Sequence, residues 1–159
     1  NAWHERNAAT RAYDRSIGRW NDGEYGAAAS GFESVTEQYR SVTASVDAAD
    51  ALEAGFDGMD RPETVDRERL RLYFDRMYEW IETAITRSEL MAEAASAREV
   101  GDVSTARERT ATAAEKTETL RAMRFPSPAD VARALELLQG ERTEATTDLP
   151  DDTSTVLYS

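Results

Sequence analysis

Hydrophobic residues recur at spacings of three and four along most of the chain, and alternation with a period of two is nearly absent. Because an α-helix has 3.6 residues per turn, this spacing places apolar side chains on one face of a helix. The pattern therefore predicts an all-α protein. We expect an antiparallel helical bundle of about five helices, in which two long helices are central.

The first predicted helix covers residues 3–20 and ends at Asn21-Asp22-Gly23, where glycine can adopt the left-handed conformation that closes a helix. The second begins at about Glu24. It continues for about 35 residues, which corresponds to about 50 Å at the rise of an α-helix. Its apolar stripe consists of Phe32, Val35, Tyr39, Val42, Val46, Ala49, Leu52, Phe56 and Met59.

Gly55, Gly58 and the Asp60-Arg61-Pro62 sequence interrupt this pattern. Proline disfavours a helical conformation in the residue before it and is itself favoured at a first helical position, so the third helix is predicted to begin at about Pro62. Two long helices joined by a short turn should lie antiparallel. The third stripe consists of Leu70, Phe74, Met77, Ile81, Ala84, Ser88, Met91 and Ala95, widened by Tyr73, Trp80 and Ile85.

Two further helices are predicted after Gly101, which ends the third. Asp102 can cap the fourth helix, whose narrow stripe consists mainly of small residues. Farther on, Ser127, Pro128 and Asp130 combine a cap, a proline at the first helical position and an acid three residues after the cap. They predict a fifth helix that ends at Gly140. The stripe of the fourth helix is Val103, Ala106, Thr110, Ala113, Thr117 and Leu120.

The pattern divides the chain into a helical bundle domain, residues 1–140, and an acidic, threonine-rich tail, residues 141–159. A polar and acidic segment of this kind cannot bury enough apolar surface to order itself. Its last apolar residues, Val156-Leu157-Tyr158, leave open a second interpretation, in which the tail docks on the bundle or on a partner.

Gly23-Glu24-Tyr25, followed by Ala28, Phe32 and Val35, resembles the second half of a tetratricopeptide repeat: a turn, an aromatic residue, a small residue, a large one and a small one. The small residue lets a paired helix approach closely, and the large one fills the next gap. The resemblance implies helical hairpins stacked into an array. A second copy consists of Gly101-Asp102-Val103, Ala106, Thr110 and Ala113, with Ala94 in the preceding helix.

The sequence departs from the tetratricopeptide pattern in three respects. Ala12 stands where the family has a large residue, the closing proline is missing, and the two copies begin 78 residues apart, at Gly23 and Gly101. True repeats of this family recur at about 34 residues. A plain antiparallel bundle, or a long hairpin with terminal helices docked on it, therefore remains an alternative to a repeat array.

The charge of the chain excludes several classes of partner. It has 31 acidic and 19 basic residues, a formal net charge of −12, and Lys116 as its single lysine. Nucleic acids and anionic membranes are bound through clustered basic residues, so neither is expected as a partner. With abundant alanine, threonine and arginine, this composition resembles proteins of salt-loving archaea, in which salt screens the self-repulsion. An ordinary acidic bacterial protein is the alternative.

The residues needed for common catalytic sites are missing from the sequence. It has no cysteine, a single histidine, His4, and no glycine-rich phosphate loop. We therefore expect a protein that is not an enzyme and that uses no cofactor or metal. No apolar run approaches the roughly 18 residues of a membrane span. Because the chain opens at Asn1 without methionine, a signal or membrane anchor upstream is a further expectation, and the cellular side stays open.

Two groups of residues are candidates for binding. Acidic residues repeat at spacings of three and four beside the apolar stripe of the second helix and could form an interaction surface: Asp47, Asp50, Glu53, Asp57 and Asp60. Large aromatic residues near the stripes could line a pocket between helices: Trp20, Tyr25, Tyr73 and Trp80. The sequence thus predicts an interaction or scaffold domain that binds another protein. A sensor domain with a small ligand between its long helices is the alternative.

Overall fold

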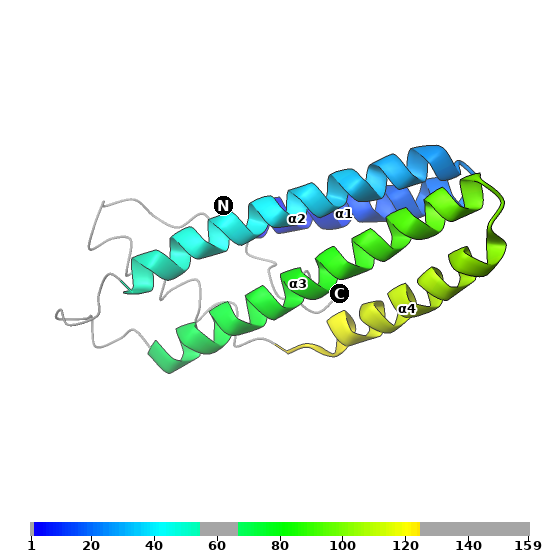
Figure 1. Ribbon diagram of the computed structural model, residues 1–159. Coiled ribbons are helices and arrows are strands. Elements are labelled where there is room, and N and C mark those ends of the chain that lie inside the picture. The colour runs from blue at the N-terminus through cyan, green and yellow to red at the C-terminus, as the bar shows by residue number, and fades with distance from the viewer. Residues whose placement is uncertain (1, 55–66, 125–159) are drawn as a thin grey trace.

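The computed structural model describes residues 2–54 and 67–124, and these residues form four helices joined by turns, with no strand among them (Figure 1). The all-α prediction is confirmed. The fifth predicted helix, the tail from residue 141 and the predicted start of the third helix at Pro62 lie outside the described residues. The helices are α1 (Ala2–Asn21), α2 (Tyr25–Ala54), α3 (Arg67–Glu99) and α4 (Val103–Ala122).

The two tight turns are closed by glycines, as the sequence predicts. Gly23, between α1 and α2, has φ +79°, and Gly101, between α3 and α4, has φ +82°. Asp102 caps α4, because its carboxylate accepts hydrogen bonds from the backbone nitrogen of Thr105 at 3.1 Å and from its hydroxyl at 2.7 Å. These two hydrogen bonds stabilise the charged form and lower the pKa of Asp102.

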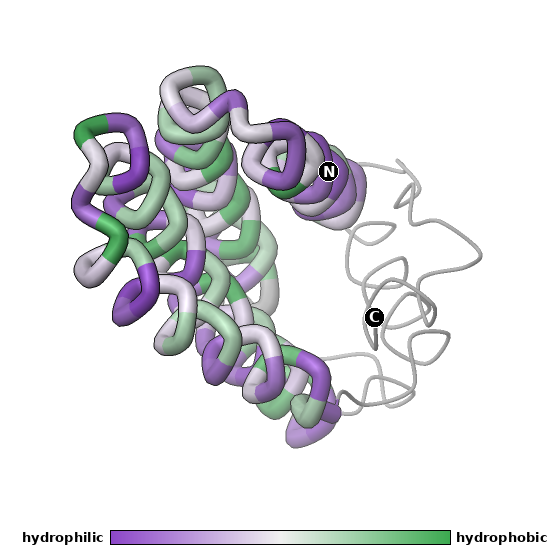
Figure 2. The backbone as a smooth tube through the Cα atoms, turned by 90° about the vertical axis from the view of Figure 1, so that its right-hand side faces the viewer, coloured by the Kyte–Doolittle hydropathy of each residue, from purple (hydrophilic) through white to green (hydrophobic). Residues whose placement is uncertain are grey.

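Each helix packs mainly on its neighbour in the chain. The long helices α2 and α3 lie antiparallel at the centre, α1 packs on α2, and α4 packs on α3 (Figure 1). The outer helices α1 and α4 make few contacts with each other, so the four helices form a helical bundle that is open between them. In Figure 2, hydrophobic positions recur along the helices between hydrophilic ones, as expected for helices with one buried face.

The predicted stripes supply the core. The large residues of the α2 stripe from Phe32 to Val46 are buried, Leu52 is partly buried, and the buried stripe of α3 packs against them. Small residues fill the places where helices come closest: Ala28, Ala94, Ala106 and Ala113 are each no more than 2 % exposed. This explains the narrow stripe of α4, because alanine permits a short distance between helix axes. The least exposed large side chains of α2 and α3 are Phe32, Val35, Tyr39, Val42, Leu70, Phe74, Met77 and Ile81.

Gly31 allows the closest approach of α1 and α2. A Cβ atom at this position would lie 2.4 Å from Oγ of Ser16 and 3.3 Å from its Cβ. Ser16 is buried, and its hydroxyl donates to the carbonyl of Ala12 at 3.0 Å, so the side chain has little freedom to move away. Gly31 is thus retained for packing, although glycine in a helix interior costs about 1 kcal/mol relative to alanine.

We expect Gly31→Ala to destabilise the protein by about 1–2 kcal/mol, because the overpacking exceeds the gain in helix propensity. Gly18→Ala is a matched control, since nothing lies within 4 Å of a Cβ at Gly18; it should stabilise α1 by about 0.5–1 kcal/mol. Urea unfolding followed by circular dichroism measures both. The double variant Ser16→Ala/Gly31→Ala should recover most of the loss, and equal effects of the two alanine variants would contradict the packing argument.

Candidate functional site

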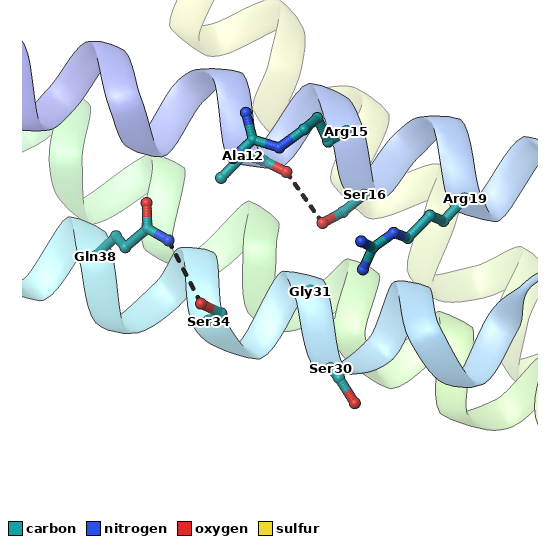
Figure 3. A pocket seen from close by; sticks show the side chains of 8 residues that line it. All are labelled: Ala12, Arg15, Ser16, Arg19, Ser30, Gly31, Ser34 and Gln38. Carbon is teal, nitrogen blue, oxygen red and sulfur yellow. Dashed lines mark hydrogen bonds between the residues drawn. The ribbon is translucent and has the colours of Figure 1, made fainter.

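A groove with a volume of about 280 Å³ runs along the outer side of the α1–α2 hairpin (Figure 3). Polar and small residues form its walls and floor, and none of the described residues that line it carries a carboxylate. Both helices contribute, so the tight turn at Gly23 fixes the geometry of the groove. The residues that line it are Ala12, Arg15, Ser16, Arg19, Ser30, Gly31, Ser34 and Gln38.

One wall belongs to a row of arginines on α1. Arg11, Arg15 and Arg19 are spaced four residues apart, so they follow one another along the same side of the helix at intervals of about 6 Å. All three are exposed, and none forms an ion pair within residues 2–54 and 67–124. Arg15 and Arg19 line the groove itself.

The opposite wall is neutral and rich in hydrogen-bonding groups. Ser30, Ser34 and Gln38 are also spaced four apart, on α2, and the Gln38 amide donates to the Ser34 hydroxyl at 3.4 Å. Arg19 points back into the groove (Figure 3). Its Nη1 lies 3.9 Å from the position that a Cβ atom would occupy if Gly31 were replaced by alanine. Cations on one wall and hydroxyl and amide groups on the other can bind an anion, but they include no general base or nucleophile placed for catalysis.

A second group of polar residues is buried where α1 crosses α3. The Cζ atom of Arg6, on α1, lies 3.8 Å from the ring centroid of Trp80 on α3. In the reverse direction, the Cζ atom of Arg87, on α3, lies 3.8 Å from the ring centroid of Tyr13 on α1. Two reciprocal cation–π contacts therefore join helices that are not neighbours in the chain. We call Arg6, Tyr13, Tyr39, Trp80 and Arg87 the arginine–aromatic cluster.

Burial governs the ionisation of this cluster. It lowers the pKa of Arg6 to about 10, and the nearby Arg87 acts in the same direction. Burial also raises the pKa of Tyr13 and of Tyr39, whose hydroxyl forms a hydrogen bond with that of Thr10 at 3.0 Å. At neutral pH the tyrosines are therefore neutral and Arg6 is charged.

Arg87 also contacts α4. It is 7 % exposed, and its Nη1 donates to the hydroxyl of Thr117 on α4 at 3.5 Å. Its Nε has no hydrogen-bond partner, and no carboxylate among residues 2–54 and 67–124 pairs with its guanidinium. The ring of Tyr13, and the hydroxyl groups of Tyr39 and Thr117, therefore surround this buried cation.

The structure places only part of the predicted acidic surface. Asp47 and Asp50 accept hydrogen bonds from the hydroxyl of Tyr78 at 2.6 and 3.4 Å, and Asp50 also forms a bidentate pair with Arg71 at 2.7 and 3.2 Å. These two carboxylates therefore contact α3. The Glu53 side chain, Asp57 and Asp60 lie outside what the structure describes. Burial and the hydrogen bond to Asp47 raise the pKa of Tyr78.

The four predicted pocket aromatics lie in two separate places, two residues in each. Trp20 and Tyr25 meet edge to face beside the Gly23 turn, with ring centroids 5.1 Å apart, and Tyr25 accepts a hydrogen bond from Arg98 at 2.9 Å. Tyr73 and Trp80 are buried in the core of α3. Because Trp80 and Arg98 lie 18 residues apart on α3, the two pairs are separated by about 27 Å along it. The four residues therefore do not line one pocket.

The arginines of both sites were missed by reasoning from the sequence, which followed the aromatic and acidic residues. The spacing of Arg11, Arg15 and Arg19 is a usable signal, because a row at every fourth position shares one side of a helix. Arg87 stands on the apolar stripe of α3, three residues after Ala84. A charged residue on such a stripe indicates a buried partner, although the sequence does not tell that this partner is Tyr13.

Comparison of the chain with protein-family models, with curated proteins and with solved structures finds no match. Within residues 2–54 and 67–124, no three acidic or histidine side chains are placed to hold a metal ion. In the same ranges, no helix has both the length and the apolar character needed to cross a membrane. We therefore infer the function from the α1–α2 groove, the arginine–aromatic cluster and the net charge of the chain.

Proposed function

We propose that this chain is a non-enzymatic helical interaction or scaffold domain of a halophilic archaeal protein, and that it binds another protein. The observation that carries the proposal is the groove between α1 and α2, where Arg15 and Arg19 are exposed and pair with no carboxylate of residues 2–54 or 67–124. Charged groups left unpaired in a groove are suited to a partner. Its other lining residues offer hydrogen bonds but no chemistry of their own.

The arrangement of the helices supports a tetratricopeptide-like array as the finer description. Two hairpins, α1–α2 and α3–α4, each turn on a glycine with positive φ, and the small positions of the resemblance, among them Ala28 and Ala106, are buried at helix contacts. The domain can also be the soluble part of a membrane-anchored protein.

A halophilic origin is supported by the imbalance of surface charge. Acidic residues such as Asp14, Glu33, Glu82 and Glu115 are exposed and form no ion pair with any residue of 2–54 or 67–124. In dilute buffer they add to the repulsion of a chain with a formal net charge of −12. At salt concentrations near 1 M the Debye length falls to about 3 Å, and this repulsion is largely screened.

A sensor domain is the second candidate, and the arginine–aromatic cluster favours it. Arg87 contacts α1 through Tyr13 and α4 through Thr117, so a small anion bound at Arg87 would change the positions of three helices together. We prefer the interaction function, because Arg87 is only 7 % exposed whereas Arg15 and Arg19 are open to solvent.

Affinity capture tests the main proposal. The whole chain, tagged and immobilised, is incubated with an extract of a halophilic archaeon in molar potassium chloride, and bound proteins are identified by mass spectrometry. We expect one protein to be retained in near-stoichiometric amount and to be released by excess untagged chain. A chain that stays monomeric and retains no protein under these conditions would contradict an interaction function.

A further inference from the structure

We propose that the α1–α2 groove binds an acidic segment of the partner protein, with carboxylates that pair with Arg15 and Arg19. This inference rests on the proposed interaction function and specifies the chemistry of the partner. We prefer this basic groove as the binding surface to the acidic surface expected from the sequence, because Asp47 and Asp50 of that surface already form hydrogen bonds with side chains of α3.

Several other exposed arginines pair with carboxylates on the surface of the chain. Arg40 pairs with Glu89 at 3.2 Å, Arg71 with Asp50 at 2.7 Å and Arg76 with Glu79 at 3.2 Å. Arg107 is also exposed and forms no ion pair within residues 2–54 and 67–124, but it does not line the groove. Arg15 and Arg19 differ, because the described residues that line their groove include no carboxylate.

The spacing of the row determines the shape of a suitable ligand. The Cα atoms of Arg11, Arg15 and Arg19 follow one another along α1 at intervals of about 6 Å and span about 12 Å. Glutamates at every fourth position of a helix have the same interval. An acidic helix laid along the groove can therefore present one carboxylate to each arginine in turn. Arginine suits this role, because its planar group binds a carboxylate through two parallel hydrogen bonds.

The neutral wall completes the site. Ser30, Ser34 and Gln38 can donate hydrogen bonds to carboxylate oxygens that the arginines leave unsatisfied. The groove is deep at Gly31, because this residue has no side chain to cover the buried Ser16. A nucleic acid is a poorer fit, since a row of about 12 Å neutralises few phosphates while the surrounding acidic surface repels the rest.

The test uses two capped, alanine-based helical peptides that carry a fluorophore, one with three glutamates spaced four apart and one with glutamines in their place. Anisotropy titrations of the whole chain are done in about 1 M potassium chloride, where long-range attraction is screened. We expect the glutamate peptide to bind, and Arg15→Gln/Arg19→Gln to weaken its binding at least about tenfold.

The matched control is Arg76→Gln/Arg121→Gln, which removes the same charge from exposed arginines that pair with Glu79 and Glu118. It should change binding less than about twofold. Equal circular dichroism melting curves for all variants establish that the fold is unchanged.

Four results would overturn the inference: no binding of the glutamate peptide, equal binding of the glutamine peptide, unchanged binding by Arg15→Gln/Arg19→Gln, or tighter binding of a single-stranded oligonucleotide of the same charge.

Capture from the extract with the same variants separates this inference from the proposed function. If the wild-type chain and Arg15→Gln/Arg19→Gln retain the same protein equally, the interaction function stands and the groove inference fails. If the wild-type chain retains no protein, the interaction function fails, and the peptide titration still decides whether the groove prefers carboxylates.

Discussion

Trp80→Ala is expected to lower the free energy of unfolding by about 3–5 kcal/mol, as is usual when a large aromatic side chain is removed from a core. Trp80 is 3 % exposed and packs edge to face on Tyr39, with ring centroids 5.7 Å apart. Its loss also removes the ring against which the Arg6 guanidinium lies at 3.8 Å. A cavity and a buried cation deprived of its aromatic partner both destabilise the folded state.

Trp20→Ala provides the matched control for the same change of residue. Trp20 is partly exposed beside the Gly23 turn, so its removal should cost about 1–2 kcal/mol. Urea unfolding in molar potassium chloride, followed by circular dichroism at 222 nm, gives both values. A similar loss in the two variants would mean that the arginine–aromatic cluster contributes no more to stability than a surface contact.

Transfer from molar to about 0.1 M salt is expected to remove much of the helical signal. The repulsion among the acidic side chains is then screened only over distances beyond about 10 Å. Circular dichroism against potassium chloride concentration measures this transition. Because concentrated salt also strengthens hydrophobic burial, sucrose at matched osmolality serves as a control, and it should restore the helices less effectively than salt.

A variant with four unpaired acids neutralised tests the electrostatic cause. Asp14→Asn/Glu33→Gln/Glu82→Gln/Glu115→Gln changes the formal net charge from −12 to about −8. It should shift the transition to a lower salt concentration, since repulsion grows with net charge. If the wild-type chain keeps its full helical signal in 0.1 M salt, the halophilic interpretation fails. If the variant and the wild-type chain need the same salt, net charge is not the cause.

The periodicity of the sequence predicted the class of the fold and most helix ends, because these depend on local properties. Gly23 and Gly101 end their helices through their own backbone conformation, independently of how the helices pack. Asp102 caps the helix that follows it. The order of packing was less predictable. The two long helices are central, as the length of their stripes predicted, but nothing in the local sequence indicates that α1 and α4 stay apart from each other.

The candidate sites were harder to predict, because they depend on which helix faces which. Trp20 and Trp80 look alike in the sequence, yet one lies at a turn and the other in the core. Asp50 is one of a regular acidic series, but its partner, Arg71, comes from the next helix. The sequence shows charge and spacing, whereas the pairing of charges requires the positions of separate helices.

The reciprocal contacts of Arg6 and Arg87 also bear on the order in which the fold comes apart. A cation held against a buried ring is shielded from dissolved ions, whereas the exposed pair of Arg109 on α4 with Glu93 on α3 is weakened by them. The α4 helix, attached through small side chains at one edge, should therefore detach before α1 separates from α3. A three-helix remnant would then be the last folded unit.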